Sequence, residues 1–188
     1  MKPGVPASSV PSDGRMSISL LPYHAWAPHT LPHPDATPLP AIIAALQEIV
    51  GAEGPIHAER AYRLYILAAG GQRVGPDIRR TFHKATRQAL RNGLIRQLDD
   101  GITALDQKTL YVPGKPSTLV RELGPRQLTD VPRSEVAKLI KYLNGQDAAD
   151  DTIKRAVLNA YGLVQLSRKR SQYLDECLSN NSHRTVTT

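Results

Sequence analysis

The stretch from Pro76 to Gly93 constrains the fold of this chain more than any other. It reads PDIRRTFHKATRQALRNG and opens with a proline, which suits a first helical turn, followed by Asp77 near the positive end of the helix dipole. At the other end, Asn92-Gly93 supplies a residue that tolerates a positive φ and so closes a helix. The stretch therefore predicts one well-delimited helix.

This predicted helix has an apolar face and a basic face on opposite sides. At 100° per residue, the apolar stripe consists of Ile78, Phe82, Ala85 and Ala89. The basic stripe consists of Arg80, Lys84, Arg87 and Arg91, with Thr81, His83 and Gln88 beside it. A row of like charges repels itself unless water or an anion compensates it, so this face is either a solvated surface or a site for a polyanion.

The charge of the whole chain favours the polyanion. Its 188 residues, enough for one domain or two small ones, carry a net charge of +7 and a pI near 9.7. No stretch is apolar enough to span or coat a bilayer, so we expect nucleic acid rather than a membrane as the partner. The single cysteine, Cys177, excludes a disulfide framework and a cysteine-built zinc site. With no secretory signal in view, we expect a cytoplasmic protein.

Residues 1–38 are predicted to be a disordered, proline-rich linker. Nine of the fifteen prolines lie in the first forty residues, and the segment has little apolar surface with which to offset its ordering entropy. His24, His29 and His33 are close enough in sequence to suggest a metal, but we interpret them as polar linker residues. Tyr23 and Trp26 are candidates for docking onto a neighbouring domain.

Residues 39–114 have the element order of a winged helix-turn-helix. Apolar periodicity predicts helices over 39–52 and 58–69 before the 76–93 helix, with a very short strand at 56–57. After Gly93 the pattern alternates, which predicts strands at 94–98, 102–105 and 109–112 around an Asp99-Asp100-Gly101 turn. In this motif the third helix lies in the major groove and the hairpin wing touches the DNA backbone. The expected fold class is mainly α with a small β-hairpin (α+β).

The remainder is expected to be a connector over 115–131, a helical C-terminal subdomain over 132–178 and a disordered tail over 179–188. The helices are placed at 133–143, at 150–161 and from a Ser167 cap to Leu178. Arg168-Lys169-Arg170 places cations at the positive end of the last helix, so either an anion or solvent compensates them. Cys177 falls on an apolar face and is interpreted as an inert core thiol.

Residue patterns that indicate catalysis or cofactor binding are absent from the sequence. There is no GxxxxGK[ST], GxGxxG, HExxH or CxxC motif. Ser134 with Glu135, and His57 with Glu59, can be drawn as acid–base pairs, but capping or solvated roles explain them equally well. A last group, Asp147, Asp150, Asp151 and Lys154, lies at a helix start, where the dipole favours acids without any metal. We therefore expect no enzyme activity, no cofactor and no metal.

Several stretches resemble one known protein family. They are ALQEIVGAEGPIH (Ala45 to His57), RVGPDIRRTFHKATRQALRNGLI (Arg73 to Ile95), TLYVPG (Thr109 to Gly114), LTDVPRSEVAKLI (Leu128 to Ile140) and Ile153 to Leu166. Together they resemble the C-terminal domain of unknown function on very large bacterial helicase-like proteins, which carry a superfamily I-type ATPase core and often a Vsr-like endonuclease domain. The resemblance implies a winged-helix module associated with DNA. Neither the ATPase nor the nuclease is present here, so the chain is either a detached fragment or a free-standing module.

Three functions follow as hypotheses. The first is a DNA-binding accessory module for duplex or forked DNA, and its candidate contact residues are Arg73, Arg79, Arg80, His83, Lys84, Arg87, Gln88, Arg91 and Arg96. The second is a protein-interaction module that docks on a helicase or nuclease. A winged-helix transcriptional regulator is a further alternative, which would also bind DNA. The third is an enzyme, which lacks a catalytic constellation. The sequence does not specify the oligomeric state.

Overall fold

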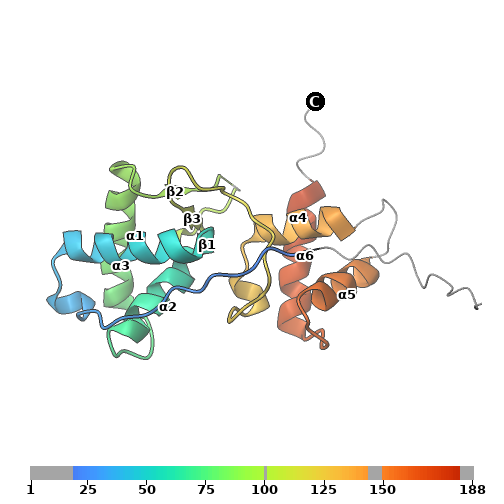
Figure 1. Ribbon diagram of the computed structural model, residues 1–188, viewed down its shortest axis with the longest axis horizontal. Coiled ribbons are helices and arrows are strands. Elements are labelled where there is room, and N and C mark those ends of the chain that lie inside the picture. The colour runs from blue at the N-terminus through green and yellow to red at the C-terminus, as the bar shows by residue number, and fades with distance from the viewer. Residues whose placement is uncertain (1–18, 100, 144–149, 183–188) are drawn as a thin grey trace, which may run out of the picture.

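A computed structural model describes residues 19–99, 101–143 and 150–182. The chain forms two units that lie side by side along the long axis of the molecule (Figure 1). The first contains η1 (Pro34–Ala36), α1 (Leu39–Glu53), β1 (Ile56–His57), α2 (Ala58–Ala68), α3 (Pro76–Arg91), β2 (Arg96–Gln97), η2 (Leu105–Gln107) and β3 (Thr109–Tyr111). The second contains η3 (Leu128–Asp130), α4 (Arg133–Leu143), α5 (Asp150–Ala160) and α6 (Arg168–Ser182).

The fold is mainly helical with a small antiparallel sheet, so the expected α+β class is confirmed. The three strands have the order β1-β3-β2, with Ile56 opposite Leu110 and Arg96 opposite Tyr111. From the sequence we expected a very short strand at 56–57 and, separate from it, a hairpin. The structure adds β1 to it, because β3 has two edges and β1 occupies the one that β2 leaves open.

The helix boundaries agree closely with the sequence, but the strand expected at 102–105 is wrong. That stretch has no strand, and Leu105–Gln107 forms a turn of 3-10 helix instead. The physical reason lies in Asp106, whose carboxylate is held by Arg79 and His83 of α3 and so keeps this part of the chain away from the sheet. The strand expected at 94–98 is reduced to Arg96–Gln97.

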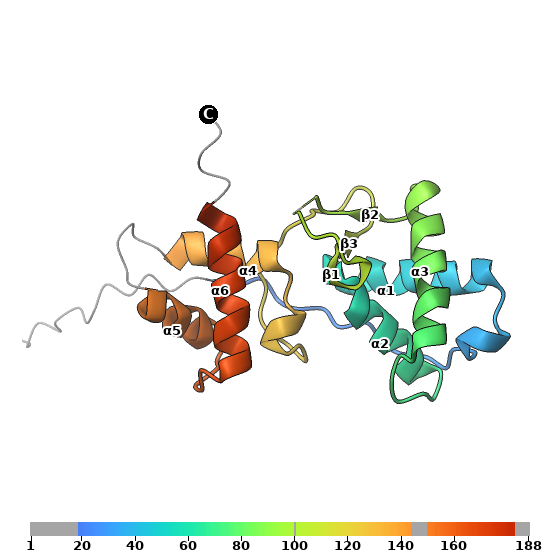
Figure 2. The same ribbon diagram turned by 180° about the vertical axis from the view of Figure 1, so that it is seen from behind.

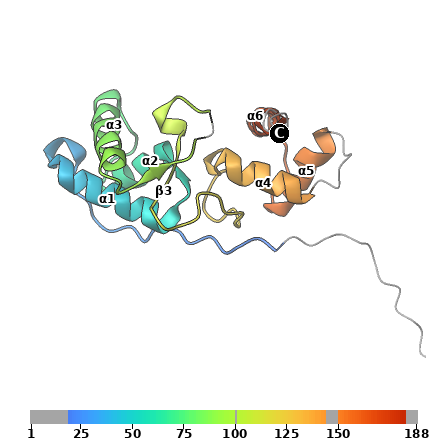
Figure 3. The same ribbon diagram turned by 90° about the horizontal axis from the view of Figure 1, so that it is seen from above.

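The N-terminal segment differs from the expected linker. Residues 19–33 run along both units as an extended chain (Figures 1 and 3), with Leu21 bridged to Arg121 and the Leu31 amide bonded to the Ala68 carbonyl. Trp26 and Leu31 are buried in the first core. Prolines suit an extended backbone, and the apolar area that these two side chains bury offsets the ordering entropy. Residues 1–18 of the expected linker lie outside the described residues.

The tail also begins later than expected. Residues 179–182 belong to α6, and the rest of the expected tail, 183–188, lies outside the described residues. Ser167 caps α6 as expected, because its Oγ accepts a hydrogen bond from the Arg170 amide at 3.4 Å. Within the described ranges, none of the helices combines the length and the apolar character that crossing a membrane requires.

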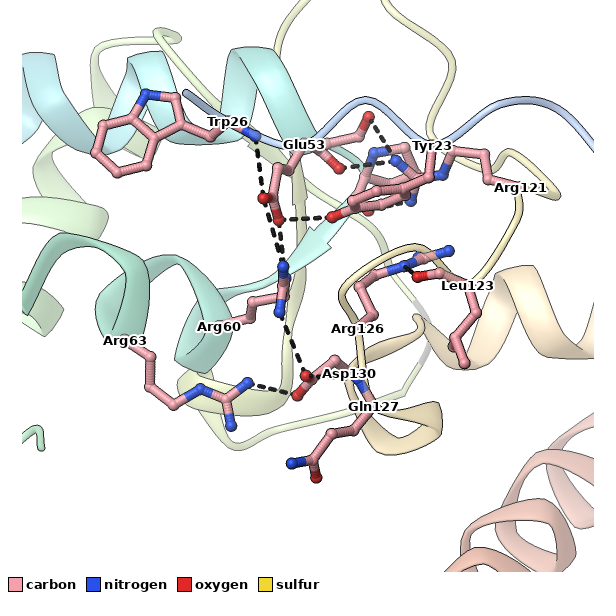
Figure 4. Close-up of polar contacts among 12 residues, drawn as sticks. Tyr23, Trp26, Glu53, Arg60, Arg63, Arg121, Leu123, Arg126, Gln127 and Asp130 are labelled. Atoms are coloured by element: carbon pink, nitrogen blue, oxygen red, sulfur yellow. Dashed lines mark hydrogen bonds and ion pairs between the residues drawn. The ribbon is translucent and has the colours of Figure 1, made fainter. Parts of the chain in front are cut away.

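A network of buried ion pairs joins the two units (Figure 4). On one side, Arg60 of α2 donates to Glu53 at the end of α1 (Nε to Oε2, 2.8 Å) and to Asp130 of η3 (Nη1 to Oδ2, 3.4 Å). On the other side, the fully buried Glu135 of α4 pairs with Arg121 at 2.8 Å and with Arg126 at 3.1 Å. The network thus ties the ends of α1 and α2 to the segment that leads into α4.

Tyr23 of the N-terminal segment completes this network. Its hydroxyl donates to Glu53 Oε2 at 2.5 Å, and its ring centroid lies 4.2 Å from Arg126 Cζ and 5.1 Å from Arg121 Cζ. Burial raises the pKa of Tyr23 well above its ordinary value, so the phenol keeps the proton that it donates to Glu53. Tyr23 and Trp26 therefore dock onto the neighbouring core, as the sequence allowed.

Candidate nucleic-acid interface

Aromatic packing fixes the rotation of α3 about its axis. Phe82 is fully buried, stacks on Tyr62 at a centroid distance of 4.9 Å and meets Tyr65 edge-on at 5.1 Å. The buried Thr86 lies one turn further on and shares a 2.8 Å hydrogen bond with the Tyr62 hydroxyl. With the Phe82–Ala89 side turned inward against α1 and α2, the opposite side of α3 is turned outward.

The outward side holds the basic stripe predicted from the sequence. Arg80, Lys84, Arg87 and Arg91, which we call the α3 basic face, are all exposed. In Figure 2, α3 lies in front of α1, at the end of the molecule remote from α4, α5 and α6. Arg80 pairs with Asp77 on the same helix, whereas the other three form no salt bridge with any described residue. A pair as exposed as Arg80–Asp77 contributes little to stability, so Arg80 exchanges partners at low cost.

Arg79 and His83, two other candidate contact residues, have a carboxylate partner instead. Arg79 Nη1 and His83 Nε2 both face Asp106 of η2, the latter at 2.5 Å from Oδ1. Both side chains are only partly exposed, and they point along the η2 side of α3 rather than away from the molecule. Long-range pairing of this kind leaves no trace in the spacing of the sequence, so sequence reasoning missed Asp106.

The remaining candidates lie around α3. Arg73 is exposed in the turn between α2 and α3, and Gln88 is half-buried on the helix. Arg96 is exposed on β2, where its register partner is Tyr111 of β3. Arg96 thus lies beside Arg91 at the end of the α3 basic face, whereas Arg73 lies before the start of α3 and lines a hollow with Arg79 and Glu59.

The acid–base pairs drawn from the sequence do not form. His57 is buried, with Nδ1 at 2.9 Å from the Gln107 carbonyl and Nε2 at 3.3 Å from the Val131 carbonyl, while Glu59 is exposed. Burial lowers the pKa of His57 and so favours the neutral ring, which carries one N–H and donates to only one of these two carbonyls. Glu135 is occupied by two arginines and leaves Ser134 without an activating base.

The metal and thiol candidates also have structural roles. His29 bonds to Glu48 at 3.2 Å, and Lys154 pairs with Asp175 at 2.5 Å, while Asp147 lies outside the described residues. Among the described residues, no group of three His, Cys, Asp or Glu side chains is placed to hold a metal ion. Cys177 is buried, and burial raises its pKa to about 12, which keeps the thiol protonated.

A protein-family model matches part of the first unit. Its description is "Protein of unknown function (DUF3320)", and it matches residues 34–80, from η1 through α1, β1 and α2 into the start of α3. Searches of curated proteins and of solved structures found no match. The chain therefore contains a domain of unknown function whose matched part includes the helices that carry and orient α3.

Proposed function

We propose that this chain is a non-catalytic DNA-binding accessory module whose first unit is a winged helix-turn-helix. The element order α1-β1-α2-α3-β2-β3, with β3 between the other two strands, supports this assignment. In it α3 is the recognition helix, and the chain from β2 to β3, residues 96–111, is the wing. The resemblance to the tail of helicase-like proteins supports an accessory role beside such an enzyme.

The observation that carries the proposal is the α3 basic face. Four exposed cations stand on one side of a helix whose other side is locked by Phe82, and three of them have no carboxylate partner among the described residues. Such a row is compensated when phosphates replace the small counterions around it. Arg73 and Arg96 extend the same charge beyond both ends of α3 and suit the flanking backbone. Arg79 and His83 are left out of this surface because Asp106 holds them.

The first prediction is a salt-dependent affinity for duplex DNA that depends on this face. Four phosphate contacts give a slope of log affinity against log salt of about −3.6. The double variant Lys84→Ala, Arg87→Ala removes two of them, so we expect the slope to flatten to about −1.8 and the affinity to fall. Fluorescence anisotropy with a labelled duplex at several salt concentrations measures both quantities.

A matched control is available on the second unit. Lys141→Ala with Arg155→Ala also removes one lysine and one arginine from exposed helical positions that form no salt bridge with any described residue, so it changes the net charge equally. We expect it to leave the slope and the affinity nearly unchanged. An equal loss from both double variants would mean that net charge, and not the α3 basic face, attracts DNA.

Exposed apolar side chains on the second unit support the alternative of a protein-interaction module. Val164, between α5 and α6, is 93% exposed, and Tyr142 of α4 is 48% exposed. A helicase or nuclease that is recovered by the wild type and lost with Val164→Asp, together with the absence of any duplex binding, would favour this alternative over the DNA-binding module.

A further inference from the structure

A pocket opens between the C-terminal end of α3 and the wing. It has a volume of about 460 Å³ and is lined by Leu90, Arg91, Gly93, Ile95, Arg96, Gln97 and Tyr111. Pockets of this size hold small organic ligands. It directly continues the α3 basic face, because Arg91 belongs to both.

This pocket differs from the α3 basic face because apolar side chains line it together with basic ones. Leu90 and the ring of Tyr111 provide apolar surface, and the Tyr111 hydroxyl and the guanidinium groups of Arg91 and Arg96 provide polar groups, whereas Ile95 is buried in the first core and Gln97 alternates with Arg96 along β2, so that its side chain leaves the other face of the sheet. Arg91 and Arg96 are exposed at the pocket and form no salt bridge with any described residue. Among the described residues, no carboxylate belongs to the lining.

The strand register brings the aromatic ring and one cation together. Arg96 and Tyr111 are directly opposite each other in the antiparallel β2–β3 pair, so their side chains leave the same face of the sheet. Tyr111 is only half-buried, which leaves part of its ring available to a ligand. Gly93, also in the lining, has φ +70 and no heavy atom within 4 Å of the position that a Cβ would occupy, so the turn after α3 adds no bulk there.

A ligand for this pocket needs a flat apolar face, polar edges and neighbouring negative charge. An unpaired nucleobase has these properties, because its face stacks on an aromatic ring and its edge forms hydrogen bonds, while the phosphates on either side are anionic. Bases inside an intact duplex are stacked on one another and do not offer a free face. The backbone of a duplex offers phosphates but nothing that would use the apolar surface of Leu90 and Tyr111.

We propose that this pocket, between α3 and the wing, binds an unpaired nucleobase where duplex DNA gives way to a single strand. Tyr111 stacks on the base, and Arg91 and Arg96 hold the flanking phosphates. The α3 basic face contacts the adjoining duplex, so this inference rests on the proposed DNA-binding function. It specifies forked or tailed duplexes as the preferred substrate class.

The test compares a blunt duplex with the same duplex carrying a 5′ tail, a 3′ tail or both, by anisotropy at one fixed salt concentration. We expect the wild type to bind at least one tailed form about tenfold more tightly than the blunt duplex, as one base–aromatic stack allows. Tyr111→Ala is expected to abolish this preference, so that the folded variant binds blunt and tailed duplexes with equal affinity. Tyr111→Phe, which keeps the ring, is expected to retain the preference, and Tyr142→Ala controls for the loss of an exposed tyrosine elsewhere.

A second readout uses the wild-type chain alone. A 2-aminopurine placed as the first unpaired base is expected to lose fluorescence on binding, because stacking on an aromatic ring quenches it. Equal affinity for blunt and tailed duplexes, or no quenching on binding, overturns the pocket while leaving the DNA-binding proposal standing. A wild type that binds neither DNA overturns both. If a folded Tyr111→Ala variant loses blunt and tailed binding equally, Tyr111 has only a structural role in the wing, and the proposed nucleobase site is likewise wrong.

Discussion

Glu135 is the residue on which the junction between the two units depends most. Its carboxylate is fully buried and compensates two arginines that are buried almost as deeply. Removing one partner of a buried ion pair is costly because the remaining charge stays out of water without compensation. Both arginines keep some compensation from main-chain carbonyls: Arg121 donates to Glu53 and Pro55 at 2.7 Å each, and Arg126 donates to Glu122 at 2.8 Å and to Leu123 at 3.1 Å.

We predict that Glu135→Gln lowers the free energy of unfolding by about 3–5 kcal/mol. The substitution keeps the shape of the side chain and removes its charge. Urea denaturation followed by circular dichroism measures the effect as a lower midpoint with an unchanged m value. The control is Glu176→Gln, which removes a partly exposed partner of Arg133 and is expected to cost at most about 1 kcal/mol. Similar costs for both variants would show that main-chain carbonyls suffice to compensate the two arginines.

Among the elements, α3 was the most predictable and its surroundings the least. Its start at Pro76, its end near Asn92 and its buried stripe follow from local capping and periodicity, and these signals are short-range in sequence. The contacts that surround α3 are long-range. Asp106 is 27 residues from Arg79, and Ile56 pairs with Leu110 of β3, so no local pattern records them.

The N-terminal segment also shows that local sequence patterns do not record long-range contacts. Its proline content predicted disorder, which is a local property, but residues 19–33 are ordered by distant partners. Trp26 donates from its backbone amide to Glu53 and from its ring to Glu48, both on α1. The two aromatic residues Tyr23 and Trp26 were the local signal in this polar segment that pointed to docking.

Removing the Asp106 carboxylate of η2 is expected to strengthen duplex binding, whereas removing Lys84 and Arg87 is expected to weaken it. Asp106→Asn removes the charge that holds Arg79 and leaves this arginine available beside the α3 basic face. We therefore expect tighter duplex binding and a slope of log affinity against log salt steeper by up to about 0.9, one additional phosphate contact. Anisotropy titrations over a range of salt concentrations measure both effects.

The matched control for this variant is Asp175→Asn, which likewise removes a carboxylate and releases a cation, Lys154, but on the second unit. It is expected to leave the salt slope unchanged. Weaker binding by Asp106→Asn would contradict the prediction and would indicate that the Asp106 clamp holds α3 in its binding position rather than masking a cation.

At the scale of the whole molecule, the two hydrophobic cores are separate, and polar contacts join them. The first core includes Trp26, Tyr62 and Phe82, and the second includes Leu139, Leu174 and Cys177. Between them lie the Glu53–Arg60–Asp130 ion pairs (Figure 4) and the Arg121–Glu135–Arg126 ion pairs. Tyr23 contacts members of both groups. Cooperativity between the units therefore depends on this network rather than on shared apolar packing.

We predict that the wild type unfolds in one calorimetric transition and that Tyr23→Ala separates it into two. The substitution removes a hydrogen bond to the buried Glu53 carboxylate and two cation–π contacts, together about 2–4 kcal/mol of coupling between the units. Differential scanning calorimetry tests this through the ratio of van't Hoff to calorimetric enthalpy, which is close to one for a single transition. Tyr142→Ala, at an exposed site on α4, should keep one transition.

If Tyr23→Ala only shifts a single transition to lower temperature, the ion pairs couple the units without Tyr23. If the wild type already shows two transitions, the units fold independently and the network merely sets their orientation.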